Sequence, residues 1–292
     1  GGSFQAAELF GVPNLSFAMR ITDIDSDGDP DVVVVNGFDQ SVITVLRNDG
    51  NGVFDVIDSY DLAFAFFVYV ADMDVADFNG DGHPDVVGGS DNSGTVAVLL
   101  NDGEGGLLPA TPVDLGQAFP TAVLAPDVNN DGRPDVLIVN NCAQSATGDG
   151  EVRVGLNDGA GGFELADIVP LIGACHSITH PTGIKPGFLD DDDVIDLVYA
   201  SRRTDTVRVL RGLGNGSFEA ADVLPAGPKP LDVAVGDVDG DGHDDVVSGN
   251  PVATSPYTIM LTINSQCPPL PGPTERQSFA QLAALKACLR GE

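Results

Sequence analysis

Short apolar runs recur along the chain, and each follows directly on an acidic loop. The five runs are DVVVV from residue 31, DVVGG from 85, DVLIV from 135, DLVYA from 196 and DVVSG from 245. They are nearly continuous in apolar residues, whereas a strand with one wet face alternates apolar with polar residues. The pattern therefore predicts strands that are buried on both faces.

A second kind of segment, with clearer alternation, follows each run from residues 41, 95, 151, 206 and 257. Four of these segments lead into turns rich in Asn, Asp and Gly, which supply the positive-φ residues of hairpins. An outer strand is predicted to begin after each turn, at Phe54, Leu107, Phe163 and Phe218. The strands that enter the acidic loops are predicted at 17–21, 67–71, 121–125, 182–186 and 231–236. Each of the first four repeats then forms four antiparallel strands.

The acidic loops share the pattern DxDxDGxxD, with Asn replacing Asp at some positions. It occurs at 23–31, 77–85, 127–135 and 237–245, and a degenerate copy, FLDDDDVID, lies at 188–196. Successive copies begin 49 to 61 residues apart. Periods of this size indicate a repeat architecture in which each unit is one supersecondary element. No repeat contains a helical-period segment, which excludes a helical solenoid.

The fold class predicted from these repeats is all-β, a five-bladed β-propeller of four-stranded antiparallel blades over residues 1–264. The fifth repeat lacks an outer strand, because prolines at 268, 269, 271 and 273 cannot continue a ladder. Residues 1–10, GGSFQAAELF, match the outer-strand segment GNGSFEAADVL at 214–224. We therefore expect the N-terminal strand to complete the last blade and close the ring.

The remaining residues, 265–292, are predicted to form a separate tail. Residues 265–274 are a proline-rich stalk, and 275–290 have the apolar spacing of an amphipathic helix, with Phe279, Leu282, Leu285 and Leu289 on one face. Two interpretations stay open. The helix docks on the propeller, or it contacts a further domain or partner.

The charge of the chain limits its partners. The formal net charge is −31, with 44 acidic residues and only 13 Lys and Arg. Nucleic acid is excluded as a partner, because phosphate binding needs clustered cationic side chains. A solvated acidic surface is the alternative explanation of the charge. The most apolar run, residues 62–70, is too short to span a bilayer, so no membrane span is expected.

Four cysteines indicate an oxidising, extracellular setting. Three pairings are possible, and we favour Cys142 with Cys175 and Cys267 with Cys288 because both close locally. Four free thiols in a cytosolic protein are the alternative. The sequence shows no signal peptide, so we expect the chain to start after processing.

Several carboxylates crowded into one short loop repel one another and favour a bound cation. Ca²⁺ suits irregular all-oxygen coordination better than Mg²⁺. An EF-hand is excluded, because that loop needs a Glu at position 12 between two helices. Position 12 is here Val34, Gly88, Ile138, Tyr199 and Ser248, and the last acid stands at position 9, where a strand begins.

The loop, the apolar strand and the NDGxGxF turn together resemble the FG-GAP or VCBS repeat of integrin-alpha-like β-propellers, over about 264 of 292 residues. The resemblance implies Ca²⁺ ligation by side chains at positions 1, 3, 5 and 9 and by the carbonyl at position 7. Four loops carry this set: Asp23, Asp25, Asp27, Asp29 and Asp31; Asp77, Asn79, Asp81, His83 and Asp85; Asp127, Asn129, Asp131, Arg133 and Asp135; Asp237, Asp239, Asp241, His243 and Asp245.

The fourth copy in chain order departs from this pattern. Phe188 stands at position 1 and Asp193 replaces the turn glycine, whereas Asp190, Asp192 and Asp196 remain. Four calcium sites and a degenerate fifth are therefore expected.

Two classes of function fit a secreted propeller of this kind. The first is a calcium-stabilised binding or adhesion module for a protein or carbohydrate ligand. The second is a polysaccharide lyase or hydrolase with its site near insertions 141–150 and 172–185; a spacer between domains is a third possibility. Cys175, His176 and His180 could bind a transition metal, but they lack the Glu of HExxH. We assign no catalytic residue, because neither GxSxG nor a phosphate-binding loop occurs. The oligomeric state is not predicted.

Overall fold

A computed structural model describes most of the chain between residues 11 and 262. The described residues are 11–12, 15–37, 42–62, 70–90, 95–116, 120–140, 149–174, 183–238, 240, 243–250 and 258–262. The chain divides into two compact units, the first built mainly from residues up to Leu171 and the second mainly from residues after it.

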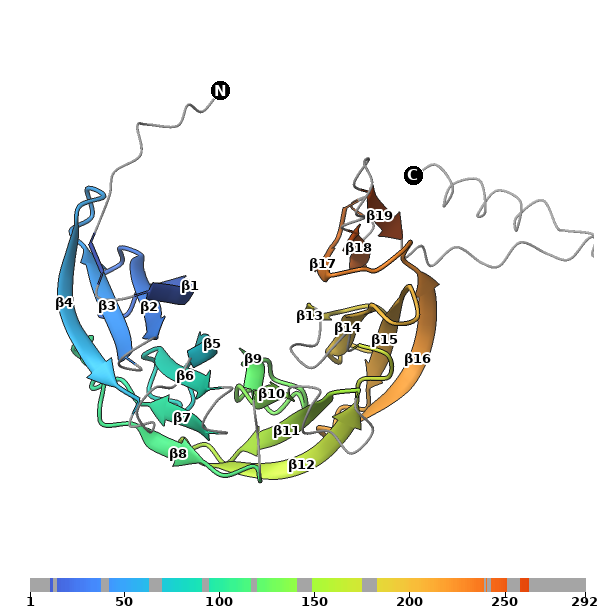
Figure 1. Cartoon of the computed structure of the whole chain (residues 1–292). Helices are drawn as coiled ribbons and strands as arrows, with labels where there is room; N and C mark the ends of the chain where they lie inside the picture. The colour runs from blue at the N-terminus through green and yellow to red at the C-terminus, as the bar shows by residue number, and fades with distance from the viewer. Residues whose placement is uncertain are drawn as a thin grey trace, which may run out of the picture. The chain divides into compact units, whose positions relative to one another are not determined.

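The first unit holds three four-stranded antiparallel sheets, in each of which the strands follow one another in chain order (Figure 1). The strands are β1 (Leu15–Thr22), β2 (Asp31–Gly37), β3 (Val42–Asn48) and β4 (Phe54–Asp61); β5 (Val70–Ala76), β6 (Asp85–Ser90), β7 (Thr95–Leu99) and β8 (Thr111–Val113); β9 (Pro120–Leu124), β10 (Val136–Asn140), β11 (Glu151–Asn157) and β12 (Phe163–Pro170).

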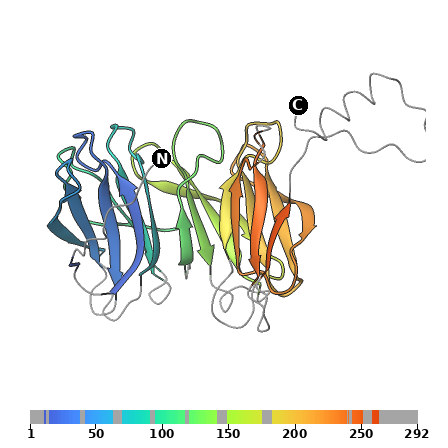
Figure 2. The ribbon, with the colours of Figure 1, turned by 90° about the horizontal axis from the view of Figure 1, so that it is seen from above.

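The second unit holds one sheet of four strands and one of three, and Figure 2 shows the strands lengthwise. The strands are β13 (Ile184–Gly187), β14 (Asp196–Ser201), β15 (Thr206–Gly212) and β16 (Phe218–Pro225), then β17 (Asp232–Gly236), β18 (Asp245–Asn250) and β19 (Thr258–Thr262). The prediction of an all-β fold with four-stranded antiparallel blades is confirmed. The closing N-terminal strand, the tail and its helix, and all four cysteines lie outside the described residues.

Burial follows the two hydrophobic patterns of the sequence. All six residues of β6 are buried, as are all five of β10, as expected for strands covered on both faces. Strands β11 and β15 share one alternating pattern of buried and half-buried residues. Apolar side chains of neighbouring sheets form the core, and Gly89 allows a close approach, since a Cβ there would lie 2.8 Å from Pro120 and Val123.

Two strand predictions were wrong in position. The strand expected at 67–71 overlaps β5, which runs on to Ala76 and includes Asp72 and Asp74, while residues 67–69 lie outside the described residues. The outer strand expected from Leu107 begins only at Thr111, because Pro109 has no amide hydrogen to donate to a ladder. Leu107 forms only an isolated bridge with Asn101. Among the described residues, no helix is long and apolar enough to cross a membrane.

Candidate metal centre

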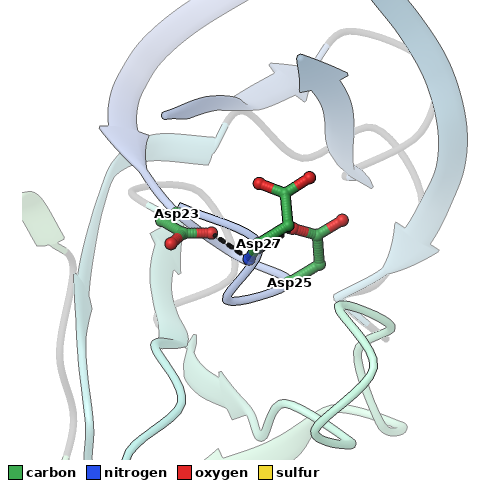
Figure 3. Close-up of side chains that lie close together, drawn as sticks. All are labelled: Asp23, Asp25 and Asp27. Atoms are coloured by element: carbon green, nitrogen blue, oxygen red, sulfur yellow. Dashed lines mark hydrogen bonds between the residues drawn. The ribbon is translucent and has the colours of Figure 1, made fainter. Parts of the chain in front are cut away.

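Acidic loop 1, residues 23–31, joins β1 to β2 and gathers three carboxylates. Asp23, Asp25 and Asp27 each offer an oxygen, and these three atoms lie within 4.8 Å of one another (Figure 3). The amide of Asp27 donates to Oδ1 of Asp23 at 3.1 Å and to Oδ1 of Asp25 at 3.3 Å. The loop backbone therefore folds around its own carboxylates and brings one oxygen of each close to the others.

The same local folding recurs in acidic loops 2 (residues 77–85) and 3 (127–135). The position-1 carboxylate accepts the amide of the glycine at position 6, as in Gly28 to Asp23 at 2.9 Å; the matching pairs are Gly82 to Asp77 and Gly132 to Asp127, both at 2.8 Å. All three glycines have positive φ, which a residue without a Cβ adopts at low cost. In acidic loop 4 (188–196), Asp193 adopts this conformation in place of glycine, with φ 56°.

The position-9 aspartates are buried and fasten each loop to its sheet. In loop 2, Oδ2 of Asp85 accepts the amide of Phe78 at 2.9 Å and Oδ1 accepts that of Asn101 at 2.7 Å. Asp31, Asp135 and Asp196 also accept two backbone amides each. Their role as calcium ligands stays a prediction, whereas this fastening role was not visible in the sequence.

Burial also changes the acidity of these groups. Removal from water disfavours the charged carboxylate and raises the pKa of Asp85 to about 6, although the amides of Asn101 and Phe78 act in the opposite direction. The same cause raises the pKa of Asp31, Asp135 and Asp196. In the absence of a cation, each of the loops at 23–31, 77–85, 127–135 and 188–196 thus holds one carboxylate whose ionised form is disfavoured.

The donor set of loop 1 fits a hard divalent cation. Two carboxylate charges about 5 Å apart repel by about 3 kcal/mol at an effective dielectric near 20, which a cation would relieve. Arg47 relieves only part of it, since its Nε lies 3.2 Å from Oδ2 of Asp25. Asp23, Asp25 and Asp27 would hold Ca²⁺ through oxygen atoms alone.

Loops 2 and 3 contain an amide where loop 1 has its middle carboxylate. Nδ2 of Asn79 donates to Asp81 at 2.9 Å, and Asn129 binds Asp131 in the same way. In loop 3 the guanidinium of Arg133 also pairs with Asp131. Both loops keep oxygen donors at the predicted positions, but loop 3 already carries a positive charge of its own.

Loop 4 departs most from the set of residues that a cation site requires. Phe188 offers no carboxylate, and Nε of Arg211 lies 2.7 Å from Oδ2 of Asp190. Asp244, from the next repeat, accepts the amide of Phe188 at 2.8 Å and donates its own amide to the Phe188 carbonyl at 3.1 Å. In acidic loop 5 (237–245), Asp237 accepts the amide of Gly240 at 2.6 Å, and Asp239 and Asp241 lie outside the described residues.

A charged cluster that the sequence pattern did not predict lies on the first strands of the sheets. Nε of Arg20 in β1 lies 2.8 Å from Oδ1 of Asp74 in β5, and its NH2 atom lies 3.6 Å from Oδ1 of Asp72. The other oxygens of these aspartates accept the amides of Val123 at 3.3 Å and Ala125 at 2.9 Å. The cluster joins three sheets of the first unit, and the signal for it was the pair of acids inside β5.

A family model, the FG-GAP-like repeat, matches three stretches of the chain, residues 23–88, 77–138 and 189–248. Together they cover more than half of the sequence, and they include loops 1, 2, 3 and 5 and all of loop 4 except Phe188. No curated protein matches the chain.

Solved structures share the fold at low sequence identity. A lectin of Agrocybe aegerita that recognises non-reducing terminal N-acetylglucosamine is 19% identical, with a TM-score of 0.52 over 85% of this chain and 66% of the other. BBS1N, solved in complex with ARL6DN, is 13% identical, with a TM-score of 0.58 over 85% and 66%. A Lactobacillus plantarum protein is 14% identical, with a TM-score of 0.55 over 86% and 71%. The chain thus spans just under two thirds of the length of the first two proteins.

Proposed function

The chain belongs to the FG-GAP-like repeat family, and from this premise we propose that it is a calcium-stabilised extracellular β-propeller that binds a protein or glycan. The observation that carries the proposal is the grouping of Asp23, Asp25 and Asp27, with one oxygen of each within 4.8 Å of the others, in a loop whose pattern recurs along the chain. Millimolar calcium outside cells suits loops of this type.

The role proposed for the cation is structural. Bound calcium supplies positive charge that offsets carboxylate repulsion. The chain itself supplies the hydrogen bonds that shape the loop, since Asp23 holds the turn at Gly28 and Asp31 fastens the loop to β2. The hairpin that leads into each buried strand is then rigid, and rigid loops are suited to present a binding surface.

Two features support a glycan or a protein as the ligand. The first is the net charge of −31, which disfavours nucleic acid. The second is the fold, which the Agrocybe aegerita lectin shares; at 19% identity this is an analogy of fold. A neutral glycan or a protein surface satisfies both.

The test is binding of the purified chain to a glycan array and to candidate extracellular proteins, with millimolar calcium or with EDTA. We expect calcium-dependent binding without turnover. A triple variant, Asp23→Asn, Asp25→Asn and Asp27→Asn, keeps the side-chain shapes and removes the charges, and we expect weaker binding. Release of unsaturated or reducing sugars would contradict the proposal and favour an enzyme, and equal binding in EDTA would contradict the role of calcium.

A further inference from the structure

A buried chain of hydrogen bonds runs from loop 1 to loop 2. Oδ2 of Asp31 accepts the amide of Ile24 at 2.9 Å. The carbonyl of Ile24 accepts Nδ2 of Asn101 at 2.8 Å, across 77 residues of sequence. The amide of Asn101 in turn donates to Oδ1 of Asp85 at 2.7 Å. Two position-9 aspartates of neighbouring repeats are thus joined through one residue, Ile24, and one asparagine.

The same chain continues from loop 2 to loop 3. The amide of Phe78 donates to Oδ2 of Asp85 at 2.9 Å, and the carbonyl of Phe78 accepts Nδ2 of Asn157 at 2.9 Å. The amide of Asn157 then donates to Oδ1 of Asp135 at 2.9 Å. We call the whole path, from Asp31 to Asp135 through Asn101 and Asn157, the asparagine relay.

Each relay asparagine also holds its own loop. Nδ2 of Asn101 donates to the carbonyl of Pro84 at 3.0 Å, and Nδ2 of Asn157 donates to that of Pro134 at 2.8 Å. One amide group therefore contacts position 2 of one loop and position 8 of the next. Both asparagines are 3% exposed, so water competes little for these bonds.

The position equivalent to Asn101 and Asn157 is occupied by Asn48 in the first repeat and by Gly212 in the fourth, and neither residue is shown to reach a neighbouring loop through a side chain. Nδ2 of Asn48, at the equivalent turn in the first repeat, donates to Pro30 of its own loop. The fourth repeat has Gly212 at this position; its amide still donates to Asp196 at 2.9 Å, but it has no side-chain amide to donate further. Within the part of the chain that the structure describes, the side chain that joins one loop to the next thus belongs to the second and third repeats.

We propose that the asparagine relay couples cation binding among loops 1, 2 and 3, so that loading of one loop raises the affinity of the next. The inference rests on the proposed function, because it requires the loops to bind calcium. A cation that is bound by positions 1 and 9 of a loop fixes the distance between them, and the backbone of the position-2 residue moves with it. The carbonyl of that residue accepts the next asparagine, which then positions the next loop for its own cation.

The expected change in calcium affinity follows from one hydrogen bond between each pair of neighbouring loops. A single buried hydrogen bond of this kind changes an equilibrium by about threefold to tenfold. Repulsion between cations in neighbouring loops opposes the coupling and is screened at physiological salt. Asn101 and Asn157 are accordingly positioning residues, which act on the cation through Asp85 and Asp135.

The experiment follows each loop separately in the full chain by glycine-selective ¹⁵N NMR during a calcium titration. The amides of Gly28 and Gly82 contact the position-1 carboxylates of loops 1 and 2, so each reports on its own loop. Asp27→Asn disables loop 1. We expect it to shift the midpoint of loop 2 to threefold to tenfold higher calcium.

Asn101→Gly then places in the second repeat the residue that the fourth repeat carries naturally. In this background we expect the loop 2 midpoint to be the same with and without Asp27→Asn. The contact between Ser26 and His83, at 3.1 Å, also joins loops 1 and 2 and is retained, so it serves as an internal control. Asn48→Gly is the matched control, because it removes an equivalent turn side chain without removing the link to loop 2, and the coupling should persist.

Each result points one way. The relay would be overturned if Asp27→Asn left the calcium midpoint of loop 2 unchanged in the otherwise wild-type chain. It would also be overturned if Asp27→Asn still shifted that midpoint in the Asn101→Gly background. A wild-type chain without calcium-dependent shifts at Gly28 and Gly82 would overturn the proposed function and the relay with it. If Asn101→Gly prevents folding, Asn101→Ser, which keeps a short polar side chain that does not span both carbonyls, replaces it with the same expectation.

Discussion

Loop 1 in the first unit and loop 4 in the second have the same hairpin shape but differ in what offsets the charge of their carboxylates. Loop 1 gathers the carboxylates of Asp23, Asp25 and Asp27 with one partly opposing cation, Arg47. Loop 4 begins with Phe188, pairs Asp190 with Arg211 and fastens its start to Asp244. The comparison teaches that the hairpin shape does not itself require a metal, because the chain can supply the charge and the fastening from its own residues.

Calcium removal gives the largest expected effect. A ligand at 100 times its Kd stabilises the folded state by about 2.7 kcal/mol per site, so three loaded loops contribute about 8 kcal/mol. We expect EDTA to lower the melting temperature by many degrees, as measured by scanning calorimetry. A melt that is unchanged by EDTA would rule out structural calcium in the first unit.

The next effect separates the fastening role from the metal role. Asp85→Ala leaves the buried amides of Phe78 and Asn101 without acceptors, at a cost of about 2–5 kcal/mol. We expect this loss in urea unfolding both with calcium and in EDTA. Asp196→Ala, in loop 4, should cost a similar amount, because its two oxygens also accept amides.

Asp81→Ala is the control for that pair. Its carboxylate accepts the amide of His83 on an exposed loop and is a predicted ligand. We expect it to destabilise the chain with calcium and to change little in EDTA. If Asp85→Ala behaves like Asp81→Ala, the buried aspartates act only through the cation.

The pH dependence should reverse sign with calcium. Burial raises the folded pKa of Asp85 to about 6, above the ordinary 3.8, so the folded state binds more protons than the unfolded state between these values. The calcium-free chain therefore loses up to about 3 kcal/mol of its free energy of unfolding as pH rises from about 4 to 6. Calcium favours the ionised carboxylate, so stability in calcium should rise over the same range. Urea unfolding at four pH values checks both slopes, and parallel slopes would contradict a cation beside Asp85.

The smallest effect belongs to loop 4. Arg211→Gln removes the ion pair with Asp190, which is partly exposed and worth about 0.2–1 kcal/mol. We expect the loss to be equal in calcium and in EDTA. A loss that calcium restores would show that loop 4 becomes a cation site once its arginine is removed.

The fold could be predicted largely from sequence because its signals are local. The apolar runs after each loop predicted the buried strands, and glycine and asparagine residues predicted the turns. Strand β5 was misplaced because Asp72 and Asp74 look unsuited to a packed strand. Their partners, Arg20 and the amides of Val123 and Ala125, lie 51 to 54 residues away in other repeats.

The candidate site was predictable in its residue types and less so in its roles. The spacing of loop 1 identified the three carboxylates that the structure brings together. It gave no sign that Asp31 and Asp85 hold buried amides, or that Asn101 contacts Ile24 in the preceding repeat. Turn asparagines serve their own turns in most hairpins, so nothing local distinguishes one that also joins two loops.

The most direct test of the central claim is hydrogen exchange at the acidic loops, resolved by mass spectrometry, in calcium and in EDTA. If loops 1 to 3 fold around cations and loop 4 around its own residues, calcium should slow exchange at 23–31, 77–85 and 127–135 by tenfold or more and leave 188–196 unchanged. Equal exchange of all four loops in the two buffers would contradict the account.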